Sequence, residues 1–416
     1  MNLGLRPNKL GIAQNREDSL SGRPKAFRTS AGIAGDFLGN PMIKVAFVVS
    51  GDPQSPMAHR ARAFAARLRE RYDFEILYRE ANKILALFRI WNALRRMKPE
   101  VVYVFDMSYS GVLGAWLHRL LNRTALIIET GDVIYELMRS TGNRGRVGLW
   151  LTRRLENFSL RTGDRVVVRG RFHQQWLEER GLNVDVLQDG VDVAEFAAQT
   201  SDDLRAHHGL DCELTVGMVG TSIWSDRLQM CYGWELVELL RLMKDKPVKG
   251  IMIGGGSGIA HLKQRCREYE IEDKVLFFGY VPYEQLPRYL SMIDVCLSTQ
   301  TNDIVGQVRT TGKLPLYLAA GRFVLASKVG EAAIVLDEKM LVQYEGVKDQ
   351  NYPQKLRERI ESIITNPELL NLAADNVDVA KKNFDYAVLA ERLAVIIDSI
   401  CKHSVAIDQI ESAKAC

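Results

Sequence analysis

Residues 306–332 read G-Q-V-R-T-T-G-K-L-P-L-Y-L-A-A-G-R-F-V-L-A-S-K-V-G-E-A. The stretch begins as a polar loop with two glycines, which extends to residue 313. An apolar helical pattern follows from Leu314 to Ala320, Gly321 stops it, and a short apolar strand runs from Phe323 to Ala326. The stretch therefore predicts a loop that enters a helix, followed by a buried strand.

Cations stand beside the predicted start of this helix. Backbone N–H groups that are free at a helix start, together with the positive end of the helix dipole, favour a bound anion. We therefore predict a phosphate site here, with Arg309 and Lys313 as its cations and Thr310, Thr311 and Gly312 beside them. The alternative is an ordinary helix start whose Arg and Lys are solvated.

The rest of the chain alternates short apolar strands with helical stretches of 10–15 residues. This alternation predicts an α/β fold with doubly wound parallel sheets that are covered on both faces. The predicted strands of the first half are residues 43–50, 74–78, 101–105, 125–128, 165–168 and 184–187. Those of the second half are residues 214–219, 250–253, 275–278, 295–298 and 323–326.

Changes of composition divide the chain into five predicted parts. Residues 1–41 read as a disordered extension that is dispensable, because apolar residues are sparse and lack a period. The other parts are a first domain at 42–196, a polar linker at 197–212, a second domain at 213–384, and an apolar-faced terminal helix at 385–416.

Composition restricts the class of protein. The chain has 416 residues, 47% hydrophobic and 25% charged, which suits two ordinary globular domains. No apolar run reaches the roughly 18–20 residues of a membrane span, and residues 1–41 lack the apolar core of a signal peptide. The six cysteines form no C-x-x-C pair. We therefore expect a cytoplasmic protein with reduced thiols.

Positive charge is concentrated in the first half. Residues 57–98 hold eleven Arg or Lys against four acids, and residues 139–180 hold ten Arg against four acids. Such runs are commonly solvated helix faces, but they also suit peripheral contact with anionic lipid at the inner face of a membrane. We expect no nucleic-acid partner, because basic stretches interleaved with aromatic residues are absent.

Several short motifs, in order, resemble glycosyltransferase family four, the glycosyl transferases group 1 of the GT-B fold. They are A-A-G-R-F-V-L-A-S at 319–327 with Gly330-Glu331, Q-D-G-V-D at 188–192 with Phe196, V-L-F-F-G-Y-V at 275–281, and L-P-R-Y-L-S-M-I-D-V-C-L at 286–297. The resemblance covers about residues 42–384. It implies two facing Rossmann-like domains, with a terminal helix that crosses back to the first domain.

The resemblance also implies a donor side and an acceptor side of the cleft between the domains. On the donor side, it implies that Gly220, Gly254 and Gly255 line the nucleotide, that Tyr280 and Val281 border the base, and that Arg227 reaches the diphosphate. The glycine run 254–258 reads equally well as a plain strand-to-helix turn.

In the first domain, acids and glycines follow the predicted strands. Asp132 and Glu129 follow the strand 125–128, where the family often places a His-Asp pair against the transferred sugar. Asp132 would equally suit a helix cap. Gly51, Asp52 and Asp106 stand at other strand ends and would face the acceptor, because parallel sheets bind ligands beyond the carboxyl ends of their strands.

A departing nucleoside diphosphate develops negative charge, which a metal or fixed cations can stabilise. The sequence has no D-x-D pair for a metal, and its seven histidines form no ligand spacing. We therefore predict no metal and no cofactor, with Arg309 and Lys313 as the catalytic cations and a nucleotide sugar as donor substrate.

The expected function is transfer of a sugar to a glycan or glycolipid acceptor in surface polysaccharide or lipopolysaccharide synthesis. By resemblance, the reaction would retain the configuration of the sugar. Val308 and Leu316 occupy the positions of the family's two paired glutamates. Two alternatives therefore stay open: a catalytically degenerate nucleotide-sugar-binding or partner protein, and a GT-B nucleotide-sugar epimerase.

Overall fold

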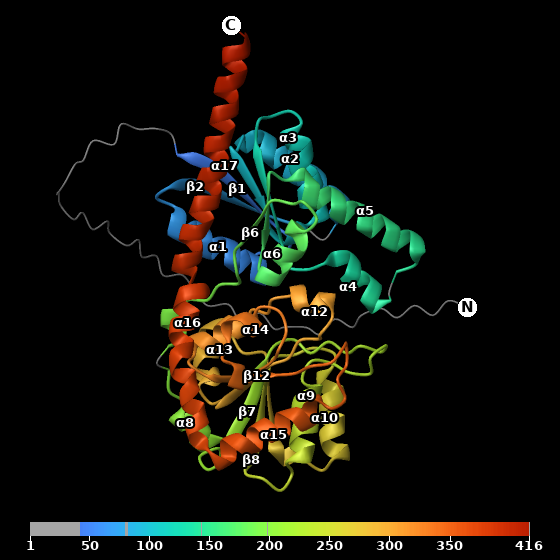
Figure 1. Ribbon diagram of the computed structural model, residues 1–416, viewed down its shortest axis with the longest axis vertical. Coiled ribbons are helices and arrows are strands. Elements are labelled where there is room, and N and C mark those ends of the chain that lie inside the picture. The colour runs from blue at the N-terminus through green and yellow to red at the C-terminus, as the bar shows by residue number, and fades with distance from the viewer. Residues whose placement is uncertain (1–41, 80–81, 143, 198, 416) are drawn as a thin grey trace, which may run out of the picture. The chain divides into compact units, whose positions relative to one another are not determined.

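The computed structural model describes residues 42–79, 82–142, 144–197 and 199–415. Within them, the chain forms two parallel six-stranded sheets with helices packed against both, so the predicted α/β class is confirmed (Figure 1). We call the first sheet with its helices the first domain, and the second sheet with its helices the second domain. The prediction that residues 1–41 are a dispensable extension lies outside the described residues.

The first sheet has the strand order β2-β1-β3-β4-β5-β6. Its central strands are apolar and buried on both faces, as parallel strands between helical layers require. Its strands are β1 (Ile43–Val49), β2 (Tyr72–Tyr78), β3 (Val101–Val104), β4 (Ala125–Thr130), β5 (Arg165–Val168) and β6 (Val184–Val186).

Helices cover both faces of the first sheet. On one face α1 (Pro56–Leu68) packs beside the terminal helix α17 (Tyr386–Ala415), which contributes Leu389, Leu393 and Ile397 to the core. The other face carries α2 (Lys83–Met97), α3 (Tyr109–Arg119) and the long α5 (Arg146–Thr162) (Figure 1). Shorter helices are α4 (Ile134–Thr141) and α6 (Arg171–Glu178).

The second sheet has the order β12-β11-β10-β7-β8-β9. Its strands are β7 (Leu214–Val219), β8 (Val248–Ile253), β9 (Val275–Gly279), β10 (Val295–Ser298), β11 (Phe323–Ser327) and β12 (Leu341–Val342). Its helices include α9 (Trp234–Leu242), α10 (Ile259–Glu268), α11 (Leu286–Leu290), α12 (Ile304–Val308), α13 (Lys313–Ala319), α14 (Ala332–Val335), α15 (Tyr352–Thr365) and α16 (Asn376–Asn383). One continuous hydrophobic core holds this domain together.

Both sheets reverse their strand order at one point. In the first sheet the reversal lies between β1 and β3, and in the second it lies between β7 and β10. Loops that leave two such neighbouring strands diverge to opposite faces and open a crevice. The loops after β1, β3, β7 and β10 are therefore where the fold offers a ligand site.

Two local predictions were wrong. The segment 197–212 is not only a polar linker, because it contains the helix α8 (Asp202–His207) and buries Leu210 completely in the second core. The segment 306–313 is not all loop, because Gly306 and Val308 belong to α12. Both helices are too short to leave a periodic pattern in the sequence.

Candidate functional site

The segment after β10 is fixed by local hydrogen bonds. Asp303 caps α12 by accepting a hydrogen bond from the Gly306 backbone N–H at 2.9 Å. A Cβ atom at Gly306 would lie 1.8 Å from the carbonyl oxygen of Thr301, so only glycine fits there. The chain then turns through residues 309–312 and begins α13 at Lys313.

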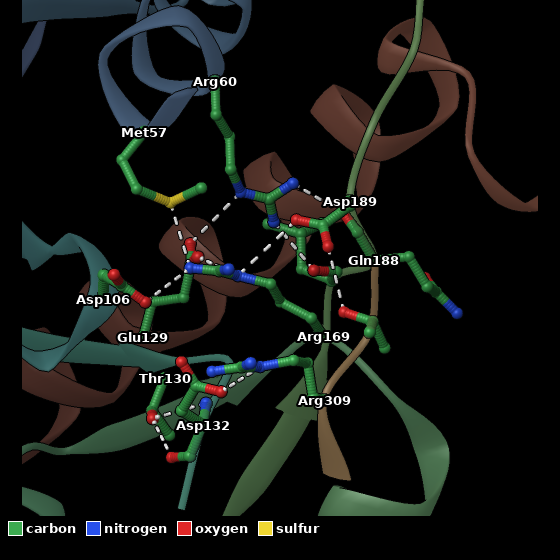
Figure 2. A network of polar contacts seen from close by, with 12 residues as sticks. Met57, Arg60, Asp106, Glu129, Thr130, Asp132, Arg169, Gln188, Asp189 and Arg309 are labelled. Carbon is green, nitrogen blue, oxygen red and sulfur yellow. Dashed lines mark hydrogen bonds and ion pairs between the residues drawn. The ribbon is translucent and has the colours of Figure 1, made fainter. Parts of the chain in front are cut away.

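Arg309 meets the acid predicted in the first domain. Its Nε donates a hydrogen bond to Oδ1 of Asp132 at 2.8 Å (Figure 2). The two side chains keep 43% and 29% of their surface exposed, so a ligand can still reach both. Beside them, the Thr310 hydroxyl donates to the carboxylate of Asp189 at 2.9 Å. Loops from the two domains therefore meet at this point.

Lys313 lies on the other side of the same loop. Its Nζ stands 3.5 Å from the centre of the Tyr232 ring, and a Cβ atom at Gly220 would lie 3.4 Å from Nζ. Burial lowers the pKa of Lys313 to about 8, with Glu235 raising it and the nearby Arg309 lowering it further. The ammonium is therefore a cation that an incoming anion would stabilise.

Sequence reasoning missed Glu235, the carboxylate next to Lys313. It is 1% exposed, and its Oε2 accepts a hydrogen bond from the Gly233 backbone N–H at 3.2 Å. Its Oε1 has no hydrogen-bond partner in the described part of the chain, and burial raises its pKa. Glu235 lies in the first turn of α9, where an acid ordinarily indicates only a favourable helix dipole.

Glu129 is part of a buried network rather than a surface facing a substrate (Figure 2). It has no exposed surface and accepts hydrogen bonds from Tyr103 at 2.7 Å, Arg169 at 2.9 Å and Arg60 at 3.4 Å. Burial works to raise the pKa of Glu129, but the two arginines outweigh it and hold that pKa below its usual value. The predicted catalytic role of Glu129 does not fit this placement.

Asp106 belongs to the edge of that network. Its Oδ1 accepts a hydrogen bond from Arg169 at 2.9 Å, and its side chain is 38% exposed. Its backbone has φ of 57°, a conformation that is costly for a residue with a side chain. Burial raises the pKa of Asp106, while Arg169 lowers it. Asp106 thus lies beyond β3, at the reversal of strand order, with a carboxylate that is partly accessible.

The loop after β1 places Gly51 and Asp52 at the neighbouring strand end. Asp52 is exposed, and its carboxylate accepts a hydrogen bond from the Gln54 backbone N–H at 2.8 Å. A Cβ atom at Gly51 would lie 2.5 Å from the Ser55 hydroxyl. The contacts described for these two residues are therefore those of a local turn.

The glycine run after β8 is a tight backbone crossing. A Cβ atom at Gly254 would lie 2.0 Å from the carbonyl oxygen of Gly220, and one at Gly256 would lie 2.1 Å from that of Ser222. Gly255 between them faces open space. Gly254 and Gly256 are therefore required by the fold, whereas Gly255 is the member of the run that a ligand could approach.

The remaining predicted donor residues differ in how they are placed. Arg227 is exposed and donates a hydrogen bond to the carbonyl oxygen of Ser140, at the end of α4. Tyr280 is 84% exposed, while Val281 packs partly against the second core. Thr311 is half-buried and Gly312 is exposed next to Lys313. The structure thus brings together Arg309, Asp132, Lys313 and Gly220, and leaves Arg227 and Tyr280 at the periphery.

The two positions that carry glutamates in the family are apolar and packed. Val308 is 1% exposed at the end of α12, and Leu316 packs partly buried against the second core. No group of three or more His, Cys, Asp or Glu among the described residues is arranged to hold a metal ion. The charged groups of the site are therefore those supplied by Arg309, Lys313, Asp132 and Glu235.

Known proteins resemble this chain in sequence and in fold. Residues 234–378 match the family model described as Glycosyl transferases group 1. Alpha-monoglucosyldiacylglycerol synthase of Streptococcus pneumoniae (strain ATCC BAA-255 / R6) is 21% identical over 258 residues, which are 60% of this chain and 52% of that protein. The chain therefore spans about half the length of this curated relative.

Solved structures share the fold over most of the chain. The structure of Anabaena Alr3699/HepE in complex with UDP has a TM-score of 0.67 at 15% identity, covering 86% of this chain and 100% of that one. Sucrose-phosphate synthase (tll1590) from Thermosynechococcus elongatus has a TM-score of 0.70 at 14% identity, covering 87% of this chain and 100% of that one.

The two parallel six-stranded sheets and these likenesses define the fold as the GT-B fold. Over residues 234–378 the chain is in addition similar in sequence to the glycosyl transferases group 1.

Proposed function

We propose that the chain transfers a sugar from a nucleoside diphosphate sugar to a hydroxyl group of a glycan or glycolipid acceptor. The observation that carries the proposal is the meeting of Arg309, from the loop after β10, with Asp132, from the loop after β4. A cation from the second domain and an acid from the first would then flank the sugar that is transferred.

The second-domain cations would stabilise the leaving group. A nucleoside diphosphate gains negative charge as its bond to the sugar breaks, and fixed cations in a partly buried site stabilise that charge strongly. Arg309 offers a planar fork and Lys313 a point charge, with Gly220 leaving space beside Nζ. We propose that these groups act without a metal or a cofactor, and that the sugar keeps its configuration.

The ligands and names of similar proteins support the class of substrate. The HepE structures hold UDP, UDP and glucose, or UDP-glucose, and the curated relative is named as a synthase of a glucosylated diacylglycerol. We therefore propose a nucleotide-sugar donor and a glycan or lipid-linked acceptor in surface polysaccharide or lipopolysaccharide synthesis.

Contact with a membrane is part of the proposal. No helix among the described residues is long and apolar enough to cross a bilayer. Yet α2 exposes Ile84 and Phe88 by 71% and 55%, and α5 exposes Val147 and Trp150 by 80% and 59%. Apolar side chains among arginines suit the interface of an anionic membrane. We propose that this helix layer rests on the cytoplasmic face of such a membrane.

A donor screen tests the proposed function. The full chain would be incubated with a set of nucleotide sugars, and the products would be separated and identified. We expect slow release of a nucleoside diphosphate and a free sugar from one donor, accelerated by its acceptor. An interconverted nucleotide sugar would instead indicate an epimerase.

Binding of a donor without any turnover would favour a degenerate nucleotide-sugar-binding protein, the alternative that the apolar Val308 and Leu316 support. That outcome in the presence of extracts containing candidate acceptors would overturn the proposal of sugar transfer.

A further inference from the structure

A cavity of about 480 Å³ lies within the first domain, between α4, α5 and α6. Four arginines line it: Arg139, Arg153, Arg161 and Arg180. Two acids, Glu136 and Glu156, line it as well. The sequence showed only an Arg-rich run here, whereas the fold gathers the four cations around one space.

Carboxylates neutralise little of this charge. Arg139 is paired with Glu136 at 2.7 Å. Arg153 instead lies over the Tyr135 ring, 5.5 Å from its centre, and Arg180 lies over the Trp176 ring at 3.7 Å. Among the described residues, neither these two arginines nor Arg161 has a carboxylate within ion-pair distance. Three guanidinium groups therefore have no carboxylate partner, and of these Arg180 donates one N–H to the Trp176 carbonyl oxygen.

Glu156, the second acid of the cavity, repels a bound anion only weakly near neutral pH. One oxygen of Glu156 accepts a hydrogen bond from the Tyr135 backbone N–H at 3.2 Å. Burial raises the pKa of Glu156 to about 7, with Glu136 raising it further. This carboxyl group is therefore protonated, and so uncharged, more readily than that of an ordinary Glu.

The cavity lies between the proposed reaction site and the exposed face of α5. Val133, one of its lining residues, directly follows Asp132, the partner of Arg309. On α5, the exposed Val147, Trp150 and Leu151 stand within about two turns before Arg153 and about three to four turns before Arg161. The same helix thus offers cations to the cavity and apolar side chains to a lipid phase.

We propose that this cavity binds the phosphate group of a lipid-linked acceptor, whose lipid part remains in the membrane next to α5. Arginine suits this task because its planar fork forms two hydrogen bonds to phosphate oxygens at once. The role of this ligand as an acceptor rests on the proposed sugar transfer. Recognition of a phosphate-bearing amphiphile stands on the cavity itself.

Vesicle binding of the full chain tests the inference. Vesicles of phosphatidylcholine would carry either phosphatidic acid, with an exposed phosphate monoester, or oleic acid, a carboxylate, at matched surface charge. We expect wild type to prefer the phosphatidic acid vesicles by about tenfold or more, as for loss of one charge-assisted contact. Soluble glycerol phosphate distinguishes a free phosphate ligand, because it should compete only weakly if the lipid part contributes.

Two matched double variants of α5 test whether the preference for phosphatidic acid depends on the cavity arginines. Arg153→Ala with Arg161→Ala removes two cavity arginines and should make the two vesicle types bind equally. Arg146→Ala with Arg154→Ala removes two arginines that do not line the cavity, and should weaken binding to both vesicle types while keeping their ratio. Both variants should retain the melting temperature and nucleotide binding of wild type.

The inference is overturned if wild type shows no phosphate preference, if the preference survives in the cavity variant, or if soluble glycerol phosphate competes as well as the lipid. These results are independent of donor turnover. A phosphate preference that depends on the cavity arginines, in a protein that turns over no donor, would contradict the proposed function and leave the binding site in place.

Discussion

Arg309 and Asp132 are 177 residues apart in the sequence, yet they share a hydrogen bond of 2.8 Å. An Arg and Asp pair that stays partly exposed to solvent contributes little to stability, typically about 1 kcal/mol or less. The pair is therefore better explained by function than by folding. Its two members approach from different domains, in loops beyond the carboxyl ends of β10 and β4, and parallel sheets bind ligands at this edge.

Lys313 gives the site a pH dependence. Its pKa is lowered to about 8 by burial, so the free protein loses this positive charge as the pH rises through that value. We expect nucleoside diphosphate affinity and kcat/KM to fall above about pH 8. Lys313→Arg should move this decline to higher pH, because Arg stays protonated. A decline at the same pH in both proteins would assign it to another group.

Glu129 is predicted to be essential for folding. Glu129→Gln leaves Arg60 and Arg169 buried without their shared charge partner, and breaking a buried ion pair typically costs about 3–5 kcal/mol. Denaturant unfolding would measure this loss. Glu391→Gln is the control, because Glu391 is 70% exposed in its ion pair with Arg71 and should cost less than about 1 kcal/mol. Equal losses in the two variants would contradict this role of Glu129.

At the residue scale, the sequence could place Asp132 after a strand, and Arg309 and Lys313 beside a helix start, because both features follow from local patterns. It could not separate Glu129 from Asp132, although they are only three residues apart. Their difference arises from partners such as Arg60 and Arg169, which lie about 40 or more residues away in the chain. It also could not identify Glu235, since its burial depends on the packing of the whole second domain.

At the scale of elements, the loops after β7 and β8 are joined backbone to backbone. Gly220 donates its N–H to the carbonyl of Ile253 at 2.9 Å, and Ser222 donates to that of Gly255 at 2.8 Å. Positive φ at Gly220, Gly254 and Gly256 permits this approach. This backbone contact therefore supports the two loops that are predicted to line the nucleotide.

Neighbouring glycines allow this backbone contact to be tested with matched variants. Gly254→Ala should destabilise the protein by at least about 2 kcal/mol, because φ is 129° and the added Cβ would lie 2.0 Å from a backbone oxygen. Gly255→Ala should leave the melting temperature nearly unchanged, since its Cβ meets no atom within 4 Å. Thermal unfolding of both variants tests this difference. Similar melting temperatures for the two variants would contradict the close backbone contact at Gly254.

The exposed face of α5 is predicted to bind membranes. Val147→Ser with Trp150→Ser should weaken binding to anionic vesicles several-fold without changing the melting temperature, because apolar side chains are lost from an exposed surface. Val395→Ser on α17 is the control, since that valine is 68% exposed on a different helix. Binding should also weaken steeply with salt. Unchanged binding of the α5 variant, or equal binding to neutral vesicles, would contradict this surface.

Elements with a strong pattern could be predicted from the sequence, and short ones could not. The predicted bounds of β7 and of β10 match the structure residue for residue, because both are short, largely apolar runs that the fold buries. The helices α8 and α12 have six and five residues. Fewer than two turns give no detectable period, and the capping Asp303 is then the main local signal.

At the scale of the molecule, buried contacts join segments that are distant in the chain. Glu331 is 3% exposed and accepts a hydrogen bond from the Arg171 backbone N–H at 3.0 Å. A Cβ atom at Gly170 would lie 2.9 Å from a methyl group of Thr310. The terminal helix α17 adds Leu393 and Ile397 to the first core. The sequence motifs indicated the two-domain plan, but these contacts depend on packing between loops that no local pattern encodes.

The loop after β10 is central to the proposed function, because both domains contribute charged groups around it. We expect Arg309→Ala and Lys313→Ala each to lower turnover of the donor by roughly a hundredfold or more, as for loss of other electrostatic donors in active sites. Melting temperatures should remain close to that of wild type, since the Arg309 side chain is 43% exposed and lies outside the hydrophobic core.

The most direct test is therefore the rate of nucleoside diphosphate release from the accepted donor, measured for wild type and both variants with and without a chelator of divalent metals. We expect the chelator to leave the wild-type rate unchanged, and we expect each variant to release nucleoside diphosphate far more slowly. Loss of wild-type turnover on chelation, or near-normal rates in both variants, would contradict this expectation.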